Sequence, residues 1–201
     1  MNSYRTHTCS ELRAANIGKP TTLIGWVDSV RDHGGVIFID LRDRSGITQV
    51  VFHPEVNQDV AKASQQLRSE DMIQISGTVA ARLKTDTVDT TNADLPTGEI
   101  EVSADTLNVI NKADVLPFQL DRALSNEDLR LKYRYLDLRR PEMQNAIAMR
   151  HRIVKIARDY YDTNGFYEIE TPILIKSTPE GARDYLVPSR VQQGRFYALP
   201  Q

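Results

Sequence analysis

Three short segments early in the chain alternate apolar and polar residues, and only tight turns separate them. They span residues 22–30, 36–42 and 47–52. Gly34, Gly35 and Gly46 lie in the two gaps, where hairpin turns need residues that adopt positive φ at little cost. A period of two places one side of each segment in a core and the other on a surface, so the pattern predicts antiparallel β-strands.

The segments that follow predict a helix and two further strands. Residues 59–67 indicate a helix, and residues 72–82 and 99–109 predict two more strands, separated by a Thr- and Asp-rich loop at 84–98. Three strands, a helix and two strands is the order of an oligonucleotide/oligosaccharide-binding (OB) barrel. Another small β-barrel or an α+β sandwich is the alternative that the pattern leaves open. A short helix is also expected at residues 10–16, with Ser10 as its N-cap.

The second half of the chain has a different pattern. Residues 111–118 predict a linker, and the cationic, tyrosine-rich residues 129–140 are expected to support a hinge. Pro141 suits the first turn of a helix with an apolar stripe, which Asn164 and Gly165 end. Residues 166–170 then alternate as a half-buried strand does.

Composition excludes several classes of protein. With 40% hydrophobic and 26% charged residues, the 201-residue chain is typical of globular proteins. No apolar run approaches the ~20 residues that span a bilayer, and the first residues lack the apolar core of a signal peptide. Cys9 is the single cysteine, so no internal disulfide can form and a cytoplasmic location is expected. The scattered histidines predict no metal site.

The formal net charge of −2 does not single out a nucleic-acid-binding protein. Residues 1–112 contain 11 Lys and Arg against 15 Asp and Glu, whereas residues 113–201 contain 14 against 12. Because the half with the predicted barrel is the more acidic, any RNA contact there must come from a local group of side chains.

The outer face of the second strand carries residues suited to nucleic acid. Alternation places its aliphatic residues in the core and a mixed set outside, namely Val36, Phe38, Asp40 and Arg42. On the third strand, Gln49 lies between Ile47 and Val51 on one face. An exposed ring beside an amide and a guanidinium can stack on a base and read its edge. Packing of Phe38 under a loop or against the N-terminal helix is the alternative that remains open.

Two stretches of the sequence resemble the bacterial aspartyl-tRNA synthetases, which are class II aminoacyl-tRNA synthetases. The first is Gly25-Trp26-Val27 with the run from Arg31-Asp32-His33 to Phe38-Ile39-Asp40. The second is Glu180-Gly-Ala-Arg-Asp-Tyr-Leu-Val-Pro-Ser-Arg190, with FYALPQ after it. Before it, the order of a helix, a strand and Pro172 resembles motif 1 of class II.

The resemblance implies a fold that is mainly β with α. Its parts are an N-terminal five-stranded OB barrel that binds the anticodon, a hinge, and the first helix and strand elements of a class II α+β catalytic domain. The expected boundaries are residues 1–112 for the barrel, 113–140 for the hinge and 141–201 for the truncated catalytic domain. The implied activity is aspartate–tRNA ligation, by a homodimer with Pro172 at its interface. The implied partners are the tRNA anticodon stem-loop, L-aspartate and ATP with Mg²⁺, and no membrane.

For anticodon binding, the resemblance implies roles for five residues of the predicted barrel. Phe38 resembles the aromatic residue that stacks on a base. Arg31 and Gln49 resemble readers of anticodon bases, and Arg42 resembles a supporting contact. Ser29 stands where the family often carries arginine, so its contact with RNA is expected to be weaker.

Two further positions bear on the choice of tRNA. His33 resembles the forms of the enzyme that charge both aspartate and asparagine tRNAs. Thr85 falls near the second position implicated in that choice. A solvated loop residue is the alternative interpretation for both.

In the second stretch, Glu180 matches the family glutamate that contacts the amino group of L-aspartate, and a carboxylate is a suitable partner for an ammonium group. The loop around Glu180 resembles a lid over the bound amino acid, formed by Ser177, Thr178, Pro179, Gly181, Ala182, Arg183 and Asp184. From the residue pattern alone, the Pro–Glu–Gly run indicates simply a turn.

Class II catalysis needs two further arginine-bearing motifs for the ATP phosphates, and neither occurs here. The Arg-x-Glu run at Arg68-Ser69-Glu70 falls at the end of the predicted barrel helix. We therefore expect a fragment with anticodon recognition and motif 1, without catalytic residues or a bound cofactor. A free-standing OB protein that binds single-stranded nucleic acid or tRNA is the alternative. A sister synthetase for asparagine or lysine is disfavoured by the run that begins at Glu180.

We expect the 201-residue chain not to activate aspartate. Adenylate formation needs cationic groups on the ATP phosphates, and losing several such groups together costs orders of magnitude in rate. The measurement is aspartate-dependent ATP–pyrophosphate exchange, with a boiled sample as the control. Turnover well above that control would show a complete active site in these residues, and the interpretation as a truncated synthetase would be wrong.

Overall fold

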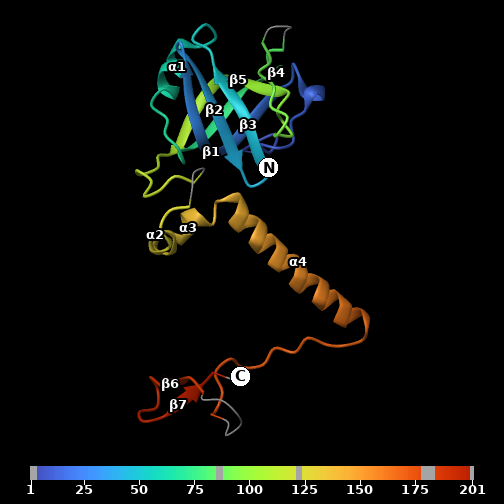
Figure 1. Ribbon diagram of the computed structural model, residues 1–201, viewed down its shortest axis with the longest axis vertical. Helices are drawn as coiled ribbons and strands as arrows, with labels where there is room; N and C mark the ends of the chain where they lie inside the picture. The colour runs from blue at the N-terminus through green and yellow to red at the C-terminus, as the bar shows by residue number, and fades with distance from the viewer. Residues whose placement is uncertain (1–3, 85–87, 121–123, 178–183, 200–201) are drawn as a thin grey trace. The chain divides into compact units, whose positions relative to one another are not determined.

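The computed structural model describes residues 4–84, 88–120, 124–177 and 184–199. The chain divides into two compact units, Met1–Pro117 and Phe118–Gln201. The first unit is built on a closed β-barrel, and the second contains helices and a small sheet (Figure 1).

The barrel is formed by β1 (Pro20–His33), β2 (Val36–Asp43), β3 (Gly46–Phe52), β4 (Met72–Ala81) and β5 (Ile100–Asn111), with α1 (Gln58–Ser64) between β3 and β4. The strand order is β1-β2-β3-β5-β4, and β4 closes the barrel against β1. The β3–β5 pair is parallel and the other pairs are antiparallel. The predicted five-stranded OB barrel is therefore confirmed.

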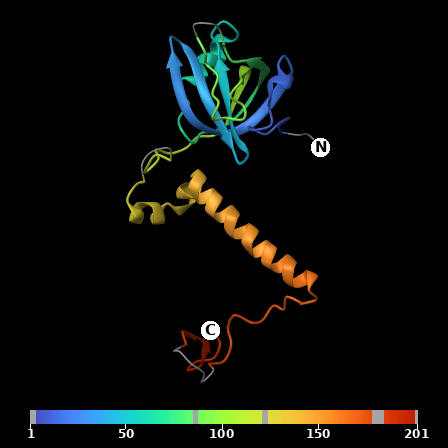
Figure 2. The same ribbon diagram turned by 45° about the vertical axis from the view of Figure 1, so that its right-hand side comes forward.

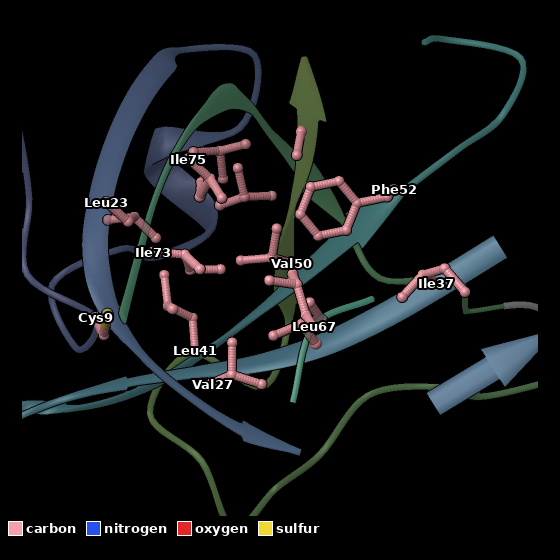
Figure 3. Packing of buried hydrophobic residues seen from close by; sticks show 14 of the residues in the cluster. Cys9, Leu23, Val27, Ile37, Leu41, Val50, Phe52, Leu67, Ile73 and Ile75 are labelled. Atoms are coloured by element: carbon pink, nitrogen blue, oxygen red, sulfur yellow. The ribbon is translucent and has the colours of Figure 1, made fainter. Parts of the chain in front are cut away.

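The interior of the barrel is aliphatic. Ile37, Ile39 and Leu41 of β2 are buried, as the alternation predicts. They pack with residues from the other strands, several of which Figure 3 shows, among them Leu23, Val27, Val50, Phe52, Ile73 and Ile75. Cys9, from the segment before β1, completes this core, and burial raises the pKa of its thiol far above the ordinary value.

The prediction of a helix at residues 10–16 is wrong. Only a short 3₁₀ turn forms, η1 (Ala14–Asn16), and its N-cap is Arg13 instead of Ser10. The segment is tied to the barrel instead, because the Cys9 N–H donates to Asp43 Oδ2 at 3.0 Å and Thr48 Oγ1 donates to the Cys9 carbonyl at 2.6 Å. Leu12 is meanwhile buried in the barrel core.

An irregularity in β1 decides which of its side chains face outward. Val27 pairs with Leu41, but Ser29 pairs with Asp40, so Asp28 is an extra residue without a partner on β2. A bulge of this kind shifts the alternation of side chains by one residue. As a result Val27 is buried in the core, while Ser29 shares the outer side with Asp40.

The second unit begins with α2 (Glu127–Lys132) and α3 (Arg134–Asp137). This is the cationic segment of the sequence, and its charges are partly neutralised within it. Arg130 Nη1 and Arg134 Nη1 lie 3.6 and 2.7 Å from Oδ2 of the buried Asp137. At least two of its cations are thus engaged in ion pairs that stabilise the segment.

Helix α4 (Pro141–Thr163) is confirmed as a continuous helix, visible in Figure 2, with Pro141 in its first turn. Gly165, just past its end, has a φ of +83°, as the expected left-handed cap requires. The strand expected at residues 166–170 is wrong, because these residues are exposed and pair with no described strand. The short strands β6 (Leu186–Pro188) and β7 (Phe196–Ala198) follow. None of the described helices is both long and apolar enough to cross a membrane.

Candidate nucleic-acid interface

A row of polar side chains crosses three strands on the outer side of the barrel. The register pairs Ser29 with Asp40 and Asp40 with Gln49. Arg31 and Phe38 form the adjacent pair, one step along the same face. Glu101 on β5 lies beside the row, because Val50 pairs with Val102. The pairing thus gathers residues that are far apart in the sequence.

Arg31 is held in this row by a bidentate ion pair. Its Nη1 donates to Asp40 Oδ2 at 2.8 Å, and its Nη2 donates to Asp40 Oδ1 at 3.0 Å. Ser29 Oγ donates to the same Asp40 Oδ2 at 2.6 Å. The guanidinium therefore has a defined plane and position at the surface.

Gln49 is oriented by its neighbours on both sides. Its Oε1 accepts from Arg31 Nη2 at 3.4 Å, and its Nε2 donates to Glu101 Oε2 at 2.8 Å. Although the side chain is mostly buried, it lines the same hollow as Arg31 and Phe38. An amide fixed in this way can present a defined donor and acceptor pattern to a ligand.

Phe38 is half-buried. Its ring meets the His33 ring edge-on, with centroids 5.5 Å apart and planes at 74°. Phe38, His33, Arg31 and Gln49 together line a hollow of about 580 Å³. Phe38 therefore lies at the wall of a cavity, and the barrel core is on the opposite side of the strand.

The loop after β4 forms another wall of this hollow, through Asp89, Thr90, Thr91, Asn92 and Leu95. Arg82 attaches the loop to the barrel, because its Nε donates to the Ile100 carbonyl at 3.0 Å and its Nη1 to the Thr90 carbonyl at 3.4 Å. Burial lowers the pKa of Arg82, and the Asp40 and Glu101 carboxylates oppose that shift. The Nη2 of Arg82 is buried without a hydrogen-bond partner among the described residues.

Arg42 is not part of this group. Its Nε donates to Asp28 Oδ1 at 2.7 Å, and its Nη2 donates to Glu70. These bonds tie the bulge in β1 to the residues before β4, so Arg42 supports the strands and does not line the hollow. Thr85 lies outside the described residues.

Most of the predicted amino-acid lid, including Thr178, Pro179, Glu180 and Gly181–Arg183, also lies outside the described residues. At its two ends Ser177 Oγ donates to Asp184 Oδ2 at 2.8 Å. Pro172 is exposed. Within the described ranges, no group of three or more His, Cys, Asp or Glu residues is arranged to hold a metal ion.

The sequence-based reasoning missed Asp40, Glu101 and Arg82 as parts of the site. Alternation does place Asp40 on the same outer face as Phe38. Glu101 is likewise outward on its strand, between the buried Ile100 and Val102. What the sequence lacks is the parallel β3–β5 register, which brings Glu101 to Gln49.

Two family models match separate parts of the chain. The model described as OB-fold nucleic acid binding domain matches residues 21–110. The model described as tRNA synthetases class II (D, K and N) matches residues 126–201. The first match contains the hollow, and the second contains α4, β6 and β7.

Curated relatives align with nearly all of the chain. An aspartate–tRNA(Asp/Asn) ligase of Halothermothrix orenii is 54% identical over 198 residues, one of Salinibacter ruber is 55% identical over 202, and one of Desulfotalea psychrophila is 56% identical over 198. Each alignment covers 98% of this chain but only 33%, 32% and 32% of the respective relative. The chain thus spans about a third of the length of the curated relatives it matches.

Solved structures are similar in fold. Asparaginyl-tRNA synthetase from Pyrococcus horikoshii, complexed with asparaginyl-adenylate, matches with a TM-score of 0.83 at 25% identity, covering 100% of this chain and 43% of that one. A putative aspartyl-tRNA synthetase from Leishmania major matches with a TM-score of 0.81 at 23% identity, covering 100% and 40%.

We expect Phe38→Ala to weaken binding of an aspartate-tRNA anticodon stem-loop by ~1–3 kcal/mol, the usual contribution of one base–aromatic stack. Because Phe38 is half-buried on the outer side, thermal unfolding should change far less than in Phe52→Ala. That control removes a fully buried ring, which costs about 3–5 kcal/mol. RNA titration and calorimetry check both expectations. A large loss of stability with unchanged RNA affinity would identify Phe38 as a core residue.

Proposed function

The chain belongs to the family of the bacterial aspartate–tRNA(Asp/Asn) ligases, and we propose that its barrel binds the anticodon of aspartate tRNA. The observation that carries this proposal is the shared hollow of Arg31, Phe38 and Gln49. A ring for stacking beside an oriented guanidinium and amide is what recognition of an unstacked base requires.

For the complete protein, we propose the ATP-dependent joining of L-aspartate to tRNA. The reaction activates aspartate as its adenylate and then transfers the aspartyl group to the tRNA. Glu180 is proposed to contact the ammonium group of aspartate, with the surrounding loop as a lid. ATP and Mg²⁺ would supply activation and phosphate neutralisation, and no residue of this chain is assigned to them.

We also propose that the second unit packs against a second subunit. Helix α4 has no buried residue, and part of it lines an apolar hollow of about 900 Å³ together with residues 166–169. Ile153, Ile169 and Ile173 are more than half exposed. An apolar surface of this kind is typical of a subunit interface. Pro172 lies within this exposed segment, in keeping with its proposed place at the interface.

The test of anticodon binding is titration of the chain with RNA hairpins that share one stem. One loop carries GUC, the anticodon complementary to an aspartate codon, and another carries the same bases in scrambled order. We expect at least about tenfold tighter binding of the GUC hairpin, because one good base contact discriminates by ~1–3 kcal/mol. Equal affinity for the two hairpins would contradict the proposed function.

His33 is proposed to influence whether the enzyme also charges asparagine tRNA. It lies at the edge of Phe38 in the hollow. In the complete enzyme, we expect His33→Leu to lower kcat/KM on asparagine tRNA about tenfold more than on aspartate tRNA, a difference of ~1.4 kcal/mol at one base.

The matched variant for this prediction is His33→Phe, which keeps a ring against Phe38 but removes the hydrogen-bonding nitrogens. If hydrogen bonding sets the choice of tRNA, Leu and Phe variants shift the ratio alike. Equal losses on both tRNAs in the Leu variant would remove the proposed role of His33.

A further inference from the structure

We propose that Asp40 is a positioning residue for RNA recognition. Its carboxylate orients the Arg31 guanidinium and offsets its charge, so that the hollow selects bases and does not bind every RNA. This inference rests on the proposed anticodon binding and concerns how the same site achieves selectivity.

The geometry gives Asp40 a supporting place behind Arg31. The exposed fraction of the side chain is 17% for Asp40 and 44% for Arg31. The carboxylate is therefore largely covered, while the guanidinium that it holds remains open to a ligand. Two parallel bonds fix both the position and the plane of the guanidinium.

Arg31 keeps a donor for a ligand while it is held. A guanidinium has five N–H groups, and Asp40 accepts from one on each terminal nitrogen. Two longer bonds of 3.4 Å use the remaining terminal donors, from Nη2 to Gln49 Oε1 and from Nη1 to Ser29 Oγ. The Nε–H of Arg31 has no hydrogen-bond partner within the described parts of the chain. A base edge can thus accept from an arginine that is already oriented.

Ser29 supports Asp40, and its Oγ also accepts a longer bond from Arg31 Nη1 at 3.4 Å. Its hydroxyl donates to Asp40 Oδ2 at 2.6 Å, and a hydroxyl has a single proton to donate. In this arrangement the proton is not available to an RNA phosphate. We therefore assign Ser29 the role of fixing the carboxylate, in place of the direct contact with RNA expected from the sequence.

The charges around the hollow explain why the ion pair of Arg31 with Asp40 affects selectivity among RNAs. Arg31 and Arg82 line it together with the carboxylates of Asp40 and Asp89. The cationic groups are thus offset, and the attraction of phosphates, which is independent of sequence, is weak. Affinity must come from stacking and from bonds to base edges, which differ between RNAs.

The test compares Asp40→Asn with the unchanged chain on two hairpins, one with GUC and one with its central base replaced, GAC. Removing one negative charge strengthens the attraction of every RNA, while Arg31 loses its bidentate partner. We expect tighter binding of the GAC hairpin and a roughly tenfold smaller affinity ratio between the hairpins. The slope of log affinity against log salt concentration should steepen by about one unit.

Asp105→Asn is the matched control, since it makes the same chemical change at an exposed residue of β5 that does not line the hollow. It should leave the ratio unchanged. Ser29→Ala removes the bond that fixes the Asp40 carboxylate, so it should lower the affinity ratio between the two hairpins about threefold, a fraction of the value of one base contact. Because this variant keeps every charge, it should not bind the GAC hairpin more tightly.

An unchanged affinity ratio in Asp40→Asn, with both affinities falling in parallel, would overturn the inference. If that variant does not fold, Ser29→Ala decides, and an unchanged ratio there has the same meaning. A wild-type chain that binds both hairpins equally would instead overturn the proposed anticodon binding itself.

Discussion

The candidate site depends on one extra residue in β1. Without the bulge at Asp28, strict alternation from the buried Val27 would turn Ser29 and Arg31 toward the core. A guanidinium there would lose its hydration in an aliphatic interior, which is costly for a charged group. With the bulge, Ser29 faces Asp40 and Arg31 faces Phe38. Arg42, bonded to Asp28 and Glu70, holds the irregular residue in place.

The acidic character of the barrel half is compatible with RNA binding because of how its charges are placed. Asp40 is paired with Arg31, and Glu101 accepts from Gln49. Each carboxylate is thus used to orient a neutral or cationic side chain that faces the hollow. Net charge describes long-range attraction and solubility, whereas the selectivity that we propose depends on short bonds between neighbouring strands.

Alternation and turn residues predicted the strands and their order, since one face of each strand is buried and the turns carry glycine. They left another small β-barrel or an α+β sandwich open, and the strand pairing decides for the closed barrel. The outward position of Phe38 followed from the same period. The bulge could not be predicted in this way, because Asp28 and Ser29 are both polar and neither residue type indicates a change in the alternation of inward and outward side chains. The short segment before β1 was predicted as a helix because its local pattern contains no sign of the bonds that tie Cys9 to Asp43 and Thr48, which are distant in the sequence.

The failed strand at residues 166–170 has a different cause. Its alternating residues do not differ from those of a true strand, but a strand forms only where another strand satisfies its backbone N–H and C=O groups. No described segment does so here, and Phe166, Tyr167 and Ile169 remain exposed. Helix α4 forms nevertheless, because its hydrogen bonds are internal. Without a neighbouring segment, residues 166–170 therefore form no strand, whereas the helix forms but keeps an uncovered apolar face. Formation of this strand requires a partner beyond the described residues.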